Sequence, residues 1–124
     1  MYNNQNLSLL TDLYQLTMMQ GYYRYGKADK IAVFDLFFRE NPFQAAFSVT
    51  AGLDQLIDYI ENLQFTEEQI AYLAGLGLFD EDFLNYLRTF RFTGEIYAVP
   101  EGSVVFPGEP LVRVKAPIME AQLI

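Results

Sequence analysis

Arg39 is the first of the few side chains in this chain that could do chemistry. The sequence has 16 acidic and 8 basic residues, a net charge of −8. Because that field repels anions, a phosphorylated small molecule can bind only where cations are placed locally. Arg39 stands beside Glu40 at the end of an apolar run, and the planar fork of a guanidinium matches phosphate geometry. The alternative is a solvated residue, or an ion pair with Glu40, that marks the end of a strand.

Tyr14 is the second candidate, and Asp12 lies close before it. Tyr14, Met18 and Tyr22 are spaced by four residues, so on a helix they form one stripe. Composition alone favours packing of this stripe on a neighbouring element. Asp12 can equally be a first-turn acid that complements the helix dipole.

Other chemistries are excluded by composition. The chain has no His and no Cys, which removes Ser-His and Cys-His catalysis, thiolate-bound zinc and disulfides. No Gly-rich phosphate loop of either common pattern is present. The acidic balance also opposes the phosphate contacts of nucleic-acid binding.

The amino-terminal half predicts a helix followed by a buried strand. Helical spacing of apolar residues over 7–25 predicts a first helix, with Ser8 or Thr11 as its N-cap. The aromatic and β-branched run 31–38 predicts a strand buried on both faces. Asp35 then needs a partner within that strand's surroundings.

The rest of the chain predicts three further helices and a small antiparallel sheet. Apolar spacing from Leu53, a capping box of Thr66 with Gln69, and a cap at Asp80 mark the helices. The predicted strands of one sheet are 95–99, 103–106 and 111–114, and Pro117 suits the first turn of a last helix. Together these elements predict an α+β fold. One domain covers residues 1–116, and residues 117–124 are the start of a helix that leads to a further domain.

The location expected from the sequence is cytoplasmic. Residues 1–6 lack the basic and apolar regions of a signal peptide, and no run approaches the roughly 20 apolar residues of a membrane span.

A series of motifs resembles the start of a nicotinate phosphoribosyltransferase. They lie in order along nearly the whole chain: Leu9 to Met18, Phe34 to Pro42, Ala51 to Leu53, Phe90 to Gly94, Val99 to Pro107 and Glu120 to Ile124. The resemblance implies the hammerhead-like N-terminal domain of a type II phosphoribosyltransferase, an α+β domain without the catalytic α/β barrel. Members of this family are much longer, so the segment alone is expected to be inactive.

The resemblance also implies roles for the two candidate pairs. In related enzymes the matching tyrosine stacks on the pyridine ring in the partner subunit's site, so Tyr14 would bind nicotinate with Asp12 at the rim. Arg39, in the strand-end pair with Glu40, would bind phosphoribosyl pyrophosphate across the interface of a homodimer. Mg²⁺ and ATP are expected for the complete enzyme and neither for this segment alone. The family's phosphorylated histidine has no counterpart here, because the chain has no His.

Two non-enzymatic alternatives remain open. The turn-rich run from Pro100 to Leu111 resembles lipoyl and biotinyl carrier domains, which need a lysine at an exposed hairpin tip. Lys115, the nearest lysine, stands in a predicted strand instead. The other alternative is a dimerisation module, whose large exposed apolar face would favour association.

Overall fold

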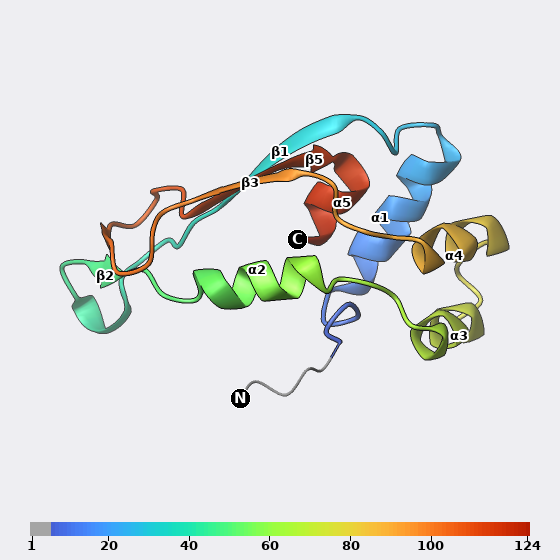
Figure 1. Ribbon diagram of the computed structural model, residues 1–124, viewed down its shortest axis with the longest axis horizontal. Helices are drawn as coiled ribbons and strands as arrows, with labels where there is room; N and C mark the ends of the chain where they lie inside the picture. Colours follow the sequence, from blue (N-terminus) through green and yellow to red (C-terminus); the bar gives the residue numbers. More distant parts are fainter. Residues whose placement is uncertain (1–5) are drawn as a thin grey trace.

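The computed structural model describes residues 6–124, which form helices and short strands (Figure 1). In chain order they are α1 (Leu13–Arg24), β1 (Ile31–Leu36), the 3-10 turn η1 (Pro42–Gln44), β2 (Ser48–Val49), α2 (Leu53–Glu61), α3 (Glu67–Gly75), α4 (Glu81–Arg88), β3 (Glu95–Ala98), β4 (Val104–Val105), β5 (Val112–Pro117) and α5 (Ile118–Leu123). The α+β fold predicted from the sequence is confirmed. The expectation about a signal peptide concerns residues that lie largely outside the described range.

A three-stranded antiparallel sheet organises the molecule, in the order β1-β5-β3. The central strand β5 alternates between buried Val112, Val114 and Ala116 and exposed Arg113 and Lys115. This period of two is what a sheet with one covered face requires. The buried side chains form a small core with Ala121 of α5, and Leu56 of α2 packs against it.

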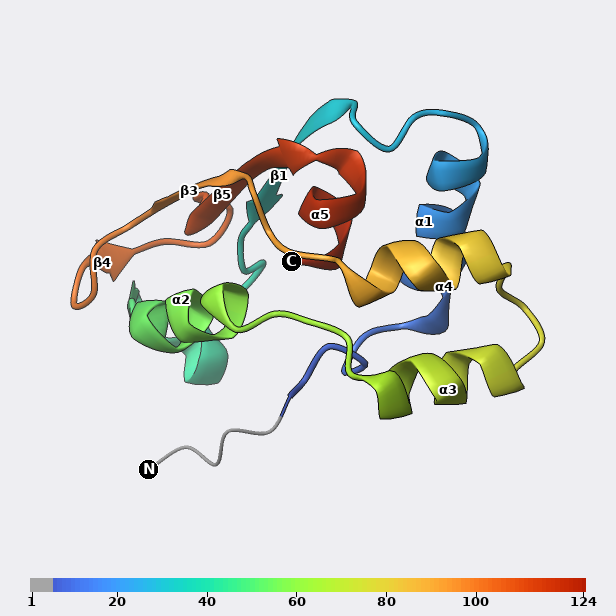
Figure 2. The ribbon, with the colours of Figure 1, turned by 45° about the vertical axis from the view of Figure 1, so that its right-hand side comes forward.

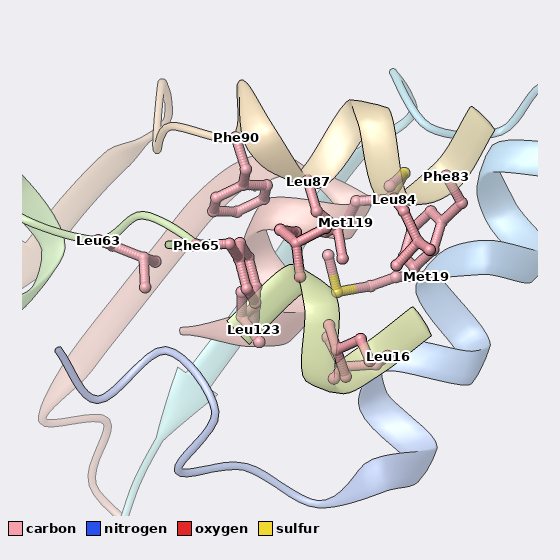
Figure 3. Packing of buried hydrophobic residues seen from close by; sticks show 12 residues of the cluster. Leu16, Met19, Leu63, Phe65, Phe83, Leu84, Leu87, Phe90, Met119 and Leu123 are labelled. Carbon is pink, nitrogen blue, oxygen red and sulfur yellow. The ribbon is translucent and has the colours of Figure 1, made fainter. Parts of the chain in front are cut away.

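A larger core joins the helices. Figure 3 shows it from close by, with Met19 of α1 and Met119 of α5 near Phe83 and Leu87 of α4. These four side chains are completely buried. The core depends on α5, so the last residues of the chain belong to its packing. The domain boundary placed at residue 116 stays a prediction.

The three middle helices follow their local sequence signals. Thr66 and Gln69 form the predicted capping box at the start of α3, with Thr66 N to Gln69 Oε1 at 2.9 Å and Gln69 N to Thr66 Oγ1 at 3.3 Å. The prediction for Asp80 is half right: it occupies the N-cap position of α4, but its side chain makes no capping bond. The carboxylate of Asp80 pairs with Arg24 instead.

The first helix is shorter than predicted. It begins at Leu13, and Asp12 holds the N-cap position without a side-chain capping bond. Ser8 is buried, and its hydroxyl donates to Gln64 O. Ser8 and Thr11 are therefore wrong as N-caps, because Ser8 has a partner distant in sequence and the helix starts beyond both residues.

The prediction that the first strand is buried on both faces is also wrong. In β1 every residue except Ala32 is exposed. The strand lies at the edge of the sheet, and Phe34 and Leu36, which pair with the buried Val114 and Val112, are 44% and 59% exposed even on the core side. Coverage by α5 reaches Ala32 but leaves these two side chains open.

Asp35 has the charged partner that its position in the sequence predicted. It lies opposite Arg113 in the sheet register, and the guanidinium donates from Nε and Nη2 to the two carboxylate oxygens at 2.7 and 2.9 Å. These hydrogen bonds lower the pKa of Asp35 below its ordinary value. Both side chains are partly exposed, which limits the contribution of the pair to stability.

We expect Asp35→Asn to lower the melting temperature slightly at neutral pH and to have no effect in strong acid. A lowered carboxyl pKa stabilises the folded state above the unfolded value, near 3.9, and this contribution is lost as the pH falls through the folded value. Melting curves of both proteins between pH 2 and 7 test this. A difference that grows as the pH falls would contradict the expected sign.

The three carboxyl-terminal strands were predicted to form one sheet, and this prediction is wrong for β4. β3 and β5 pair with each other, but β4 leaves their sheet and pairs with β2, with Val49 opposite Val104. The strand β2 could not be predicted from the sequence, because a strand of two residues carries no periodicity.

Glu101 caps α2 from a distant turn that lies next to the β2–β4 pair. Its carboxylate accepts hydrogen bonds from Gly52 N at 2.8 Å and Leu53 N at 2.6 Å.

Glu120 is a buried carboxylate that ties α5 to the segment before β3. It is 6% exposed and accepts hydrogen bonds from Thr93 N at 2.6 Å and Thr93 Oγ1 at 3.0 Å. Gly94 follows Thr93 in the chain and is packed so closely that an added Cβ would lie 2.3 Å from Ala116 Cβ and 2.7 Å from Lys115 O.

No helix within residues 6–124 is long and apolar enough to cross a membrane.

Candidate functional site

Tyr14 presents its ring at the first turn of α1. The side chain is 55% exposed, and its hydroxyl accepts a hydrogen bond from Gln15 Nε2 at 3.2 Å. Met18, one turn along, is 43% exposed, whereas Tyr22 packs against the larger core. The predicted stripe is therefore divided: its last residue packs, and its first two remain open to a ligand or another protein surface.

Asp12 lies immediately before α1 and is exposed. As the N-cap residue, it places a negative charge beside the positive end of the helix dipole. This is the structural role that the sequence allowed for it. Its position two residues before Tyr14 is equally compatible with the rim of a ring-binding surface.

Arg39 and Glu40 are exposed in the bend that follows β1. The chain is held there by a hydrogen bond from Gly108 N to Phe38 O at 2.9 Å. Among residues 6–124, no ion pair and no side-chain hydrogen bond involves Arg39, not even one with Glu40. Of the two structural alternatives, the local Arg39–Glu40 ion pair is absent, and an exposed, solvated Arg39 is what the structure contains.

The other four arginines all have partners. Arg24, Arg88 and Arg113 form ion pairs with Asp80, Glu67 and Asp35. Arg91 donates to Phe90 O and to Gln64 Oε1. Within the described residues, Arg39 is thus the one arginine whose guanidinium makes neither an ion pair nor a side-chain hydrogen bond.

The two pairs of candidate residues do not meet within this chain. Figures 1 and 2 both show the segment after β1 running toward the β2–β4 end of the molecule, away from α1. A groove of about 640 Å³, lined by residues that include Tyr97, Leu111 and Arg113, contains none of the four candidates. In this groove Arg113 is already bound by Asp35.

The described residues hold no group of three or more acidic side chains that could bind a metal ion.

The carrier alternative does not fit the geometry of Lys115. This lysine lies inside β5, between Val33 of β1 and Glu95 of β3. Its ammonium group pairs with Glu95 Oε2 at 3.4 Å. A carrier lysine must extend from a hairpin tip, so Lys115 cannot take that role.

Many of the sequence motifs contact one another and serve the scaffold. Glu101 caps α2 at Gly52, Thr93 binds Glu120, and Gly108 binds the segment that carries Arg39. Sequence analysis assigned no role to Glu101 or Glu120. A glutamate in a turn and another in a helix give no signal of the distant backbone groups that they bind.

Comparison with known proteins identifies the class of this domain. A family model described as the nicotinate phosphoribosyltransferase (NAPRTase) N-terminal domain matches residues 9–124. The nicotinate phosphoribosyltransferase of Bacillus subtilis is 47% identical over 99% of this chain, and that of Mycobacterium tuberculosis is 44% identical over 94%. The crystal structure of human nicotinic acid phosphoribosyltransferase superposes with a TM-score of 0.82 and 39% identity, over 91% of this chain and 23% of that one.

The fold and these matches define the N-terminal domain of a phosphoribosyltransferase. The chain belongs to the nicotinate phosphoribosyltransferase family, as its motifs predicted. It spans about a quarter of the length of the curated relatives, 25% of each of the two bacterial proteins.

Proposed function

We propose that this chain is the N-terminal part of an enzyme that joins nicotinate to phosphoribosyl pyrophosphate, coupled to ATP hydrolysis, to give nicotinate mononucleotide for NAD synthesis. The match of residues 9–124 to the family's N-terminal domain carries this proposal. Mg²⁺ and ATP belong to the proposal for the complete enzyme, and their sites lie outside the residues described above.

The proposed work of this domain is to bind and orient the two substrates. The exposed ring of Tyr14 stacks on the flat, electron-poor pyridine ring, with Asp12 at the rim. Arg39, beside Glu40, binds phosphate oxygens of phosphoribosyl pyrophosphate. Holding the ring nitrogen near the anomeric carbon removes much of the entropic cost of reaction, and binding the leaving pyrophosphate stabilises the charge that develops on it.

A homodimer completes each site in this proposal. Tyr14 and Arg39 act in the site of the partner subunit, which is consistent with their exposure and with the distance between their segments (Figures 1 and 2).

The test of the proposed function compares the complete enzyme with residues 1–124 alone. Both receive nicotinate, phosphoribosyl pyrophosphate, Mg²⁺ and ATP, and nicotinate mononucleotide is measured by chromatography. We expect product from the complete enzyme and none from the N-terminal part. Product at equal rates from both would mean that the chemistry does not require the rest of the enzyme.

In the complete enzyme, Tyr14→Ala is expected to raise the KM for nicotinate by about tenfold, because an aromatic stacking contact contributes roughly 0.5–1.5 kcal/mol in addition to the burial of its area. Tyr14→Phe keeps the ring and should stay close to wild type. Steady-state kinetics with each substrate varied in turn measures both variants. An unchanged KM for nicotinate in Tyr14→Ala would remove Tyr14 from the site.

A further inference from the structure

The side chain of Gln122 joins α5 to the exposed face of α1. The two helices lie side by side (Figure 1). Gln122 is half-buried, and its Nε2 donates to Gln15 Oε1 at 2.7 Å and to Met18 Sδ at 3.5 Å. Ala121 and Leu123, the residues on either side of it, are buried in the two cores. Packing therefore fixes the backbone from which the Gln122 amide reaches α1.

These contacts also determine which way each amide points. A thioether sulfur accepts hydrogen bonds and cannot donate them, so the NH2 group of Gln122 faces Met18. The same NH2 group meets the carbonyl oxygen of Gln15, because the NH2 group of Gln15 offers no acceptor. The NH2 group of Gln15 then faces Tyr14, and its Nε2 donates to the Tyr14 hydroxyl oxygen at 3.2 Å. The donors thus follow one another from Gln122 through Gln15 to Tyr14.

Gln122 restrains two exposed side chains that are neighbours on α1. Tyr14 and Met18 lie four residues apart on one face, and they are 55% and 43% exposed. Exposed side chains lose rotamer freedom when a ligand covers them, and this loss lowers affinity. A contact that orders them beforehand reduces the loss. An apolar side chain in place of Gln122 could fill the same space, but it would offer no hydrogen-bond donor to Gln15 or Met18.

We propose that Gln122 is a positioning residue, which holds the ring of Tyr14 in place for the pyridine ring of nicotinate. The proposal rests on the proposed function, in which Tyr14 stacks on that ring. Gln122 acts on Tyr14 by two routes, through Gln15 and through Met18, the next side chain on the same face. Tyr14→Phe breaks only the first route, which is compatible with binding close to wild type. Loss of the Gln122 amide breaks both.

Gln122→Met in the complete enzyme tests this role. Methionine is unbranched and of similar length, so it keeps the packing beside α1 and removes the amide. We expect the KM for nicotinate to rise about three- to fivefold, the effect of losing an ordinary hydrogen bond. The kcat and the KM for phosphoribosyl pyrophosphate should stay at their wild-type values, because the substitution changes only how well the pyridine-binding surface is ordered. Gln55→Met, at an exposed position of α2, is the matched control and should change neither Michaelis constant.

A double-mutant cycle separates the positioning of Tyr14 from a general effect on the fold. In the Tyr14→Ala background the ring is absent, so Gln122→Met should change the KM for nicotinate by less than about twofold. An equal effect in both backgrounds overturns the proposal, and so does an unchanged KM for nicotinate in Gln122→Met alone. A rise of both Michaelis constants together also overturns it, because the effect would then not be specific to pyridine binding.

Crystal structures of the complete wild-type enzyme and of its Gln122→Met variant separate the two proposals, because they require no turnover. We expect Gln15 Nε2 to lie within hydrogen-bond distance of the Tyr14 hydroxyl in the wild type and to leave it in the variant. If both side chains keep their positions in the variant, the positioning role is refuted. If they move and the wild-type enzyme is inactive, the restraint on Tyr14 is supported and the proposed function is refuted. An active enzyme whose KM for nicotinate is unaffected by Gln122→Met refutes the positioning role alone.

Discussion

Arg39→Ala in the complete enzyme is expected to raise the KM for phosphoribosyl pyrophosphate by about ten- to hundredfold while the KM for nicotinate stays near wild type. A hydrogen bond to a charged group contributes roughly 1.5–3 kcal/mol, which corresponds to this range. The other arginines of the domain are occupied by Asp80, Glu67, Asp35 and Gln64. Each of them already has a side-chain partner, which Arg39 lacks within residues 6–124.

Two control variants sharpen this experiment. Arg39→Lys keeps the charge but loses the bidentate fork, so it should fall between wild type and Arg39→Ala. Arg88→Ala removes an arginine that is paired with Glu67 at 3.2 Å on the surface, and should leave both Michaelis constants unchanged. If Arg39→Ala and Arg88→Ala have equal effects, Arg39 has no special part in phosphate binding.

Gly94→Ala is expected to destabilise the fold by about 3 kcal/mol, at the upper end of the usual cost of overpacking. The added methyl would lie 2.3 Å from Ala116 Cβ and 2.7 Å from Lys115 O. Because Ala116 and Lys115 belong to the central strand β5, relief requires movement of the sheet backbone. Urea unfolding monitored by circular dichroism measures the change in the free energy of unfolding.

The same substitution at Gly21 should have the opposite sign. Gly21 lies inside α1, and an added Cβ would meet no atom within 4 Å. Alanine favours the helix by up to about 1 kcal/mol relative to glycine, so Gly21→Ala should unfold at higher urea. If both variants lower the free energy of unfolding, the close packing around Gly94 is not what destabilises Gly94→Ala.

Features governed by neighbouring residues could be predicted from the sequence. The capping box of Thr66 with Gln69 and the apolar spacing of α2 and α4 are local signals, and these helices are confirmed. The errors concern contacts between distant segments. Whether a helix covers β1, and which strand pairs with β4, depends on residues dozens of positions away, and an apolar run alone does not specify them.

Prediction of the site divides in the same way. The substrate roles of Tyr14 and Arg39 are predicted from the resemblance, and the structure adds that both are exposed and that Arg39 has no ion pair within residues 6–124. Their roles stay predictions until the variants are measured. The left-handed backbone of Phe43, with φ 57°, could not be predicted, because no sequence pattern indicates this conformation at a phenylalanine.

The most direct test of the central claim is product formation by the complete enzyme from nicotinate, nicotinamide and quinolinate, each supplied separately with phosphoribosyl pyrophosphate, Mg²⁺ and ATP. Membership of the family predicts that nicotinate gives its mononucleotide with by far the highest kcat/KM of the three bases. Equal or faster turnover of nicotinamide or quinolinate, or no mononucleotide from any of them, would contradict the proposed function.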